Sequence, residues 1–237
     1  MKTSSRTFRV IEDYYIIHQA RYAFILNKIR DLNLPEGARI LDVGCFPQHL
    51  FKMLQDLRFE VYGVSSKHEA AYEKKIVSLN IETDKLPFKD NFFDLIIFTE
   101  IIEHLTLNPN NYMQKLKKIL KKNGKLLITT PNAVNLKNRA KMFLGKNISF
   151  SLQQLYDTTS PKEIYFRHNR EFTLEELEEV CVKSGFKISD SSHFNSYTPF
   201  RKGLNRGLAE TLVKSAGFAI TKFSPSLKDS LYILAVK

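Results

Sequence analysis

The segment Arg39–Leu50 (RILDVGCFPQHL) is the part of the chain that most restricts its fold. Its apolar run from Ile40 to Val43 predicts a short buried strand, and Gly44 ends that run. Apolar residues then recur at helical spacing from Phe46 to Leu57. A strand, a glycine turn and a helix form the first half of a nucleotide-binding βαβ unit. In such a unit a cofactor lies against the glycine backbone and the N-terminus of the helix.

Strand-like and helical segments alternate along the chain. Strands are predicted at 39–43, 59–64, 75–81, 93–98, 125–130, 186–192 and 231–236, and helices at 12–30, 46–57, 112–122, 136–144, 174–184 and 204–213. Thr173 and Glu176 form a capping box that starts the helix at 174–184. The alternation predicts an α/β fold with a doubly wound, mostly parallel seven-stranded sheet and helices on both faces. Because no linker or internal repeat divides the chain, we expect a single domain over residues 1–237.

The formal net charge of +11 is concentrated in one part of the chain. Residues 1–100 contain 14 basic and 14 acidic residues, whereas residues 101–237 contain the other 22 basic and 11 acidic residues. Such a surplus attracts polyanions, for example nucleic acid, an acidic glycan or an anionic membrane surface. The plainer interpretation, which we favour, is a solvated lysine face, because the lysines near 112–122 surround an apolar helical stripe.

The chain carries no recognisable signal for export or membrane insertion. Its N-terminus, Met1–Val10, is polar and basic without an apolar core, and no run approaches the ~18 apolar residues of a membrane span. Cys45 and Cys181 are the two cysteines and lie far apart, which argues against a disulfide scaffold. We therefore expect a cytoplasmic protein without a transmembrane segment.

Three short motifs resemble, in order, those of the class I S-adenosylmethionine (SAM)-dependent methyltransferases. Leu41–Cys45 (LDVGC) is similar to the first motif, L-D-x-G-C-G-x-G, although Phe46 and Gln48 replace its second and third glycines. Asn80–Asp94 resembles the acidic loop and L-P-F…F-D segment, and Thr129–Asn132 (TTPN) also matches this family. The resemblance implies a Rossmann-like fold, a C-terminal antiparallel hairpin that closes the sheet, and SAM as the cofactor.

The same resemblance implies which residues bind the cofactor: Asp42, Gly44, Phe46, Ser65, Glu82 and Thr99. Ser65 ends the second predicted strand, where an acidic residue usually holds the ribose hydroxyls. Glu69 could supply that contact from the following loop. In the acidic loop, Glu82 or Asp84 would contact the adenine.

A motif of acidic residues and a histidine, Glu100–His104 (EIIEH), follows the predicted strand at 93–98. On a helix, positions i, i+3 and i+4 share one face, so Glu100, Glu103 and His104 are expected to converge. Two carboxylates beside an imidazole suit a divalent cation of intermediate hardness. The alternative is a helix N-terminus that favours acidic residues, with a paired histidine.

A second motif, Arg167–Thr173 (RHNREFT), precedes the predicted capping box. Together the two motifs resemble the metal-dependent small-RNA 2′-O-methyltransferases, in which two glutamates and two histidines hold one divalent ion over a terminal ribose. The resemblance implies that Glu100, Glu103, His104 and His168 bind Mg, Mn or Zn, and that Glu103, His104 and His168 are catalytic. An E-x-x-E-H motif also occurs in ubiquinone-biosynthesis O-methyltransferases. The RHNREFT variant is similar to that of uncharacterised bacterial and archaeal methyltransferases associated with surface-polysaccharide synthesis.

We expect a SAM-dependent methyltransferase that acts on a hydroxyl of a small molecule or glycan, with a divalent metal as an assisting ion. The segments at about 133–170 and 195–225 would cap the site. Arg167, Arg170 and Tyr165 would cover the acceptor, and the arginines suit an anionic one. Two alternatives stay open. One is an RNA 2′-O-methyltransferase whose basic second half holds phosphates. The other is a non-catalytic protein with the methyltransferase fold.

Overall fold

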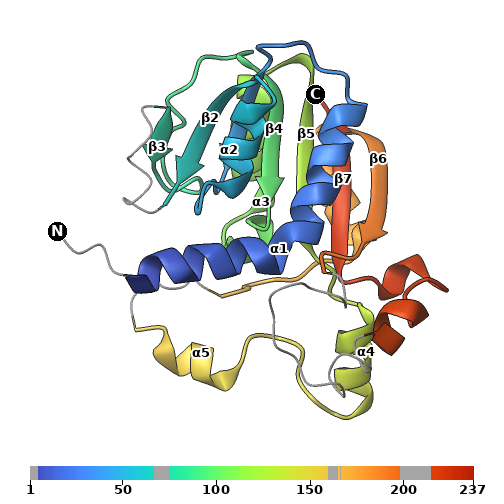
Figure 1. The fold of residues 1–237 in the computed structure, drawn as a ribbon. Helices are drawn as coiled ribbons and strands as arrows, with labels where there is room; N and C mark the ends of the chain where they lie inside the picture. Colours follow the sequence, from blue (N-terminus) through green and yellow to red (C-terminus); the bar gives the residue numbers. More distant parts are fainter. Residues whose placement is uncertain (1–4, 67–74, 160–164, 166, 198–214) are drawn as a thin grey trace.

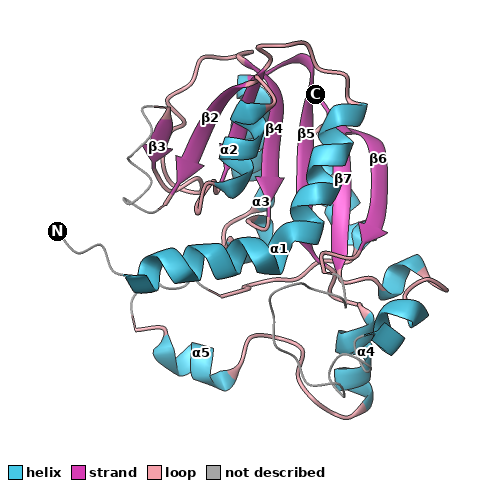
Figure 2. Ribbon diagram, in the orientation of Figure 1, coloured by secondary structure: helices cyan, strands magenta, loops and turns pink. Residues whose placement is uncertain are grey.

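A seven-stranded mixed sheet with helices on both faces forms the body of the molecule (Figures 1 and 2). The computed structural model describes residues 5–66, 75–159, 165, 167–197 and 215–237. The strands are β1 (Arg39–Val43), β2 (Glu60–Ser65), β3 (Ile76–Ser78), β4 (Phe93–Thr99), β5 (Leu120–Pro131), β6 (Lys187–Phe194) and β7 (Ser230–Val236). The helices are α1 (Ser5–Asp31), α2 (His49–Asp56), α3 (Pro109–Ile119), α4 (Leu136–Phe143), α5 (Leu152–Asp157) and α6 (Leu174–Lys183), with short 3-10 helices η2 (Ile102–His104) and η4 (Pro225–Leu227). Within these described ranges, every helix is too short or too polar to cross a bilayer.

The strand order in the sheet is β3-β2-β1-β4-β5-β7-β6. Strands β1 to β5 pair in parallel, whereas β7 is antiparallel to both β5 and β6. The parallel strands β1 and β4 are almost wholly buried, as expected for strands covered on both faces. The predicted doubly wound sheet and its antiparallel C-terminal closure are confirmed.

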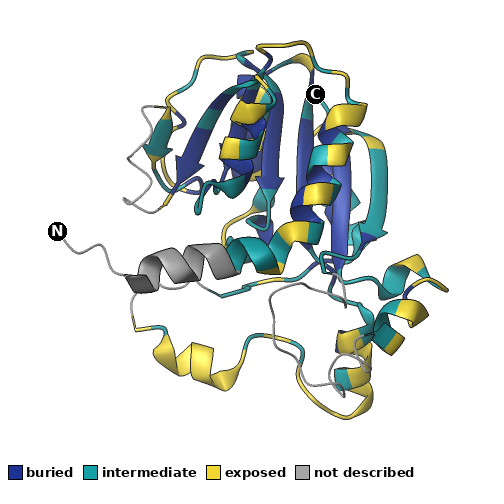
Figure 3. Cartoon of the chain, viewed as in Figure 1, coloured by how far each residue is buried: buried dark blue, intermediate teal, exposed yellow. Residues whose placement is uncertain are grey.

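The two faces of the sheet carry different helices (Figure 3). On one face, α1 and α2 pack against the sheet. Ile25 of α1 and Leu127 of β5 are buried in the same apolar cluster. On the other face, α3 and α6 cover Leu126 and Ile128, with Leu116 in the same cluster. Successive side chains of a strand point to opposite faces, so neighbouring residues of β5 meet different helical layers.

Some predicted boundaries are wrong, and backbone conformation explains them. Helix α3 ends at Ile119, before Asn123 and Gly124, because Leu120 is already extended and pairs with Phe93 of β4. Helix α2 begins only at His49, since Gln48 has a left-handed backbone (φ 68°). The third strand is shorter than predicted. The predicted helix at 204–213 lies outside the described residues.

The described parts of the segments expected to cap the site, residues 133–159 and 215–225, lie beyond the carboxyl ends of the parallel strands (Figure 1). Helix α4 follows directly on β5, and α5 follows α4. Arg139 of α4 donates a hydrogen bond to the Ser226 hydroxyl (3.0 Å), which links α4 to the segment that precedes β7. Ligands of open α/β sheets bind at this carboxyl edge, so these segments are placed to contact one.

Candidate active site

Two hollows at the carboxyl ends of β1, β2 and β4 form the candidate cofactor cleft. The first, about 540 Å³, is lined by Val43, Gly44, Val64, Ser65, Ser66, Leu79, Asn80, Ile81, Ile101, His104, Leu105 and Tyr165. The second, about 490 Å³, is lined by Tyr14, Arg21, Tyr22, Asp42, Gly44, Cys45, Phe46, Pro47, Gln48, His49, Leu50, Thr99, Glu100 and Ile101. Because Gly44 and Ile101 line both hollows, the two are halves of one cleft.

Gly44 and Ile101 meet where the two halves join. Gly44 has a left-handed backbone (φ 81°), and a Cβ added there would lie 2.1 Å from Ile101 Cδ1. Only glycine therefore fits this position. The Ile101 side chain occupies the space beside the glycine backbone, so a cofactor that spans both halves requires this side chain to turn aside.

The first half of the cleft contains Ser65, as predicted, but not the carboxylate of Glu82. The Glu82 carboxylate accepts hydrogen bonds from the backbone N–H of Thr106 (2.8 Å), from the Thr106 hydroxyl (3.1 Å) and from the backbone N–H of Leu107. Glu82 thus holds the loop after η2, and its adenine contact stays a prediction. Asp84 is exposed and accepts from the backbone N–H of Asn80. Glu69 lies outside the described residues.

The second half of the cleft brings together the predicted residues Asp42, Phe46 and Thr99. Asp42 is buried at the end of β1, and burial raises the pKa of its carboxyl to about 7. A buried carboxyl with a raised pKa binds a cationic group well, because the cation restores the ionised form.

Arg21 is a residue of the cleft that sequence reasoning missed. It comes from α1, its guanidinium is almost fully buried, and it lies 3.0 Å from a Glu100 carboxylate oxygen. Burial, the largest single effect, disfavours the charged guanidinium, but Glu100 together with Tyr14 and Tyr22 outweighs it and raises the pKa of Arg21. The sequence did contain a signal for this role. Arg21 is a charged residue within the apolar stripe of the helix, next to Tyr22 and four positions before Ile25.

Glu100 does not share a helical face with Glu103 and His104. Glu100 has a left-handed backbone (φ 55°) and precedes η2, which starts at Ile102, so the predicted one-face helix is wrong. The Glu100 carboxylate accepts a hydrogen bond from the Thr129 hydroxyl (2.9 Å) and pairs with Arg21. It belongs to the cofactor cleft and lies outside the cluster that Glu103 forms.

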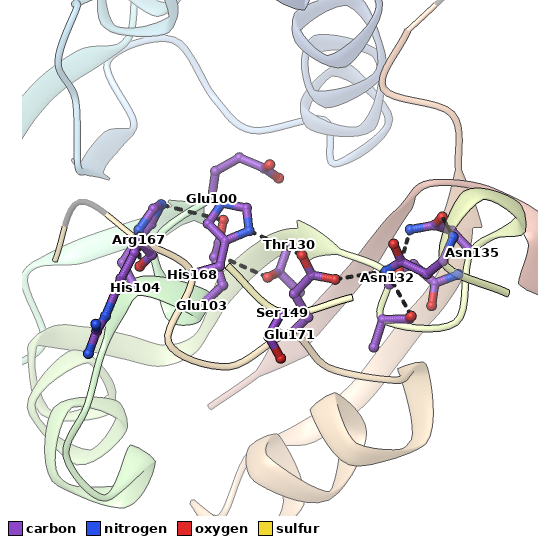
Figure 4. A network of polar contacts seen from close by, with 12 residues as sticks. Glu100, Glu103, His104, Thr130, Asn132, Asn135, Ser149, Arg167, His168 and Glu171 are labelled. Atoms are coloured by element: carbon purple, nitrogen blue, oxygen red, sulfur yellow. Dashed lines mark hydrogen bonds and ion pairs between the residues drawn. The ribbon is translucent and has the colours of Figure 1, made fainter. Parts of the chain in front are cut away.

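Glu103, His104 and His168 form a cluster whose potential ligand atoms all lie within 4.8 Å of one another (Figure 4). Glu103 is fully buried, and its Oε2 accepts a hydrogen bond from the Thr130 hydroxyl (2.8 Å). Its Oε1 is buried, has no hydrogen-bond partner among the described residues, and lies 3.9 Å from His104 Nε2. Burial, and then the charge of Glu100, raise the pKa of the Glu103 carboxyl.

Each histidine of the cluster is oriented through its Nδ1. His104 Nδ1 donates to the backbone carbonyl of Arg167 (3.0 Å), and since a carbonyl only accepts, the ring carries its hydrogen there. His168 Nδ1 lies 3.2 Å from Glu171 Oε1, and Asn138 of α4 donates to the other oxygen of Glu171 (3.1 Å). With Nδ1 of each ring so engaged, Nε2 is the atom that would take a metal, as is usual at metal-binding histidines.

The pKa values of the two histidines shift in opposite directions. Burial, and then the neighbouring His168, lower the pKa of His104. The hydrogen bond to Glu171 raises the pKa of His168.

The loop that carries His168 is fastened to η2 by its backbone. The N–H groups of Asn169 (2.7 Å) and Arg170 (3.1 Å) both donate to the Glu103 carbonyl, and the Asn169 side chain donates to the His104 carbonyl. These bonds explain why two motifs far apart in the sequence meet.

Three residues were expected to cover the acceptor. Tyr165 does line the first half of the cleft. The Arg167 guanidinium lies over the Phe150 ring (4.4 Å) and donates to Asn169. Arg170 is exposed and paired with Glu176 (2.7 Å), so its charge is already balanced.

The fold and cleft define a Rossmann-like protein with a small-molecule site at the carboxyl edge of its sheet. A family model described as a methyltransferase domain matches residues 16–190, and the chain belongs to this family. It is a SAM-dependent methyltransferase, and its acceptor is a small molecule or a macromolecule.

Individual relatives agree with this assignment. The chain is 25% identical over 200 residues to a ubiquinone biosynthesis O-methyltransferase of Glaesserella parasuis, covering 78% of this chain and 79% of that one. It is 29% identical over 128 residues to the protein of the same name from Cereibacter sphaeroides, covering 49% of this chain and 51% of that one. Among solved structures, a SAM-dependent methyltransferase from Thermotoga maritima matches with a TM-score of 0.60 at 19% identity, over 98% of this chain and 97% of that chain.

Proposed function

We propose that this protein methylates a hydroxyl oxygen held beside Glu103, His104 and His168, and that these three side chains bind a divalent cation. The observation that carries the proposal is the buried, unpartnered Glu103 Oε1, which faces the Nε2 side of His104. A buried acceptor without a partner is costly, and a bound cation would remove that cost. The names of the O-methyltransferase relatives support an oxygen acceptor.

The donor set favours some metals over others. One carboxylate and two imidazoles suit Zn²⁺ or Mn²⁺ better than Mg²⁺, which prefers oxygen ligands. Glu171 and the Arg167 carbonyl would fix the two rings from behind. Such an ion, when bound, acts as a Lewis acid that lowers the pKa of an acceptor hydroxyl.

The cofactor side of the cleft supplies orientation. SAM carries the methyl group on a sulfonium, and methyl transfer is a direct displacement that depends on alignment. Asp42 and Arg21 offer one anion and one cation to the zwitterionic methionine end, while Ser65 offers a hydroxyl at the far end of the cleft. Orientation of this kind contributes about 7–11 kcal/mol to catalysis.

His104 links the two sides of the proposed site. It lines the first half of the cofactor cleft and also belongs to the cluster. Because Nδ1 is committed to the Arg167 carbonyl, Nε2 is the ring atom that would hold the cation, next to the cofactor.

The test is calorimetric titration of the metal-free protein with Zn²⁺ and Mn²⁺. We expect one site in the wild type, no binding by Glu103→Gln or His168→Ala, and unchanged binding by the control His193→Ala, whose ring lies on β6 away from the cluster. Loss of metal-stimulated methylation of vicinal-diol acceptors should follow the same pattern. Wild-type protein that binds neither metal, or Glu103→Gln and His168→Ala proteins that bind as well as the wild type, would contradict the metal site.

A further inference from the structure

Large apolar side chains are exposed mainly in the segments beyond the carboxyl edge of the sheet. Among the described residues, eight of the eleven large hydrophobic side chains that are exposed lie there: Met142, Phe143, Leu144, Leu152, Leu155, Tyr156, Ile220 and Phe223. Phe143 is 90% exposed and Phe223 is 89% exposed. Figure 3 shows these exposed stretches of α4, α5 and residues 215–223 at the end of the molecule away from the top of the sheet. We refer to the eight side chains as the apolar patch.

Helix α5 presents three of the exposed apolar side chains on one face. Leu152, Leu155 and Tyr156 stand at i, i+3 and i+4 and share one face of this helix. None of the residues of α5 is buried, and a capping box at Ser151 and Gln154 nevertheless defines its start. An amphipathic helix whose apolar side chains stay exposed in the described part of the molecule indicates an external partner.

The charge around the patch is strongly one-sided. Within 133–159 and 215–228 the basic residues are Lys137, Arg139, Lys141, Lys146, Lys222 and Lys228, whereas Asp157 is the sole acidic residue. Lys146 and Lys222 are exposed next to the apolar side chains of Leu144 and Phe223. Cations that border protruding aromatic and aliphatic side chains match a surface that is anionic outside and apolar beneath.

We propose that the apolar patch and its lysines dock the protein on the surface of an anionic lipid bilayer. A second copy of the chain is a poor occupant, because six like charges on each side would repel. A bilayer accepts protruding side chains from three separate segments at once, since its headgroup region deforms around them. The partner is identified by lipid charge and an apolar interior, and the proposal does not depend on the proposed acceptor or metal.

The test is flotation of the full chain with vesicles, at low salt, of phosphatidylcholine alone or of phosphatidylcholine with phosphatidylglycerol. We expect binding to the phosphatidylglycerol vesicles and about fivefold weaker binding for each of Lys141→Glu and Lys222→Glu. The double variant Phe143→Ser/Phe223→Ser should lose binding to the phosphatidylglycerol vesicles. Val182→Ser is the matched control, because Val182 is 58% exposed on α6, outside the patch.

Thermal unfolding of each variant shows whether it is folded, and we expect unchanged midpoints because Lys141 is half-buried and the other substituted positions are exposed. Wild-type protein that stays unbound with phosphatidylglycerol vesicles overturns the proposal, as does equal binding by the double variant. Size-exclusion chromatography tests whether a second copy of the chain covers the patch. A wild-type protein that is dimeric and a double variant that is monomeric would assign the patch to a second copy and overturn lipid docking.

Discussion

The ionisation of Asp42 gives a quantitative test of the cofactor cleft. The pKa of this buried carboxyl is raised to about 7. The methionine part of SAM carries an ammonium group, which interacts with a carboxylate far better than with a neutral acid. Binding should therefore remove the proton from Asp42, and the affinity should rise as the pH increases through about 7.

The size of the effect follows from the same pKa. Below it, each pH unit costs about tenfold in affinity, so the dissociation constant should rise about thirtyfold from about pH 8 to about pH 5.5. Stability without ligand should change in the opposite sense. A carboxyl with a raised pKa stabilises the folded state fully below its unfolded pKa of 3.8, and this stabilisation is lost as the pH rises to about 7. The loss in the free energy of unfolding should be about 4 kcal/mol.

Isothermal titration with S-adenosylhomocysteine, which has the same ammonium group, measures the first trend, and urea unfolding measures the second. Asp42→Asn should bind weakly without pH dependence over this range, and the difference in unfolding free energy between wild type and variant should follow the titration of Asp42. Asp84→Asn is the control, because Asp84 is exposed and its pKa is lowered. A thirtyfold pH dependence that persists in Asp42→Asn would refute the assignment of Asp42 to the cofactor.

Three further substitutions test other contacts. Ile101→Ala should strengthen S-adenosylhomocysteine binding about fivefold in calorimetry, because the ligand no longer has to turn aside the side chain beside Gly44; weaker binding would contradict this. Glu82→Gln should lower the free energy of unfolding in urea by about 2–3 kcal/mol, since three hydrogen bonds from Thr106 and Leu107 lose their charged acceptor; a change under about 0.5 kcal/mol would be inconsistent with that role. Asn132→Ala should cost about 2–4 kcal/mol by the same measurement, because the fully buried amide donates to the carbonyls of Ser226 and Lys228; wild-type stability would show that water replaces it.

Local patterns predicted the body of the sheet well. The apolar runs of β1 and β4 and the glycine after β1 were sufficient, because a strand buried on both faces needs a continuous apolar sequence and Gly44 occupies a position with no room for a side chain. The end of α3 was less predictable. The helix ends before Leu120 because Leu120 pairs with Phe93 of β4, and the local sequence does not indicate this long-range contact.

The candidate site was predictable only in part for a similar reason. The motif containing Glu103 and His104 and the distant motif containing His168 do come together, as the resemblance implied. Glu100 departs from them because Thr129 and Arg21 hold its carboxylate elsewhere, and Arg21 lies far upstream in α1. Sequence spacing describes one element at a time, whereas these contacts join three.

The alternation of Thr129 and Thr130 at the end of β5 has a consequence for how such a protein diversifies. The Thr129 hydroxyl supports Glu100 on the α1 side, and the Thr130 hydroxyl supports Glu103 on the α6 side, so two successive residues hold the two carboxylates from opposite faces of the sheet. Mutations on one side leave the other side's hydrogen bonds in place. A substitution at Thr130 therefore leaves the Thr129–Glu100 hydrogen bond of the cleft in place. A directed-evolution library for altered acceptor choice should vary the Thr130 side and keep Arg21, Glu100 and Thr129 constant.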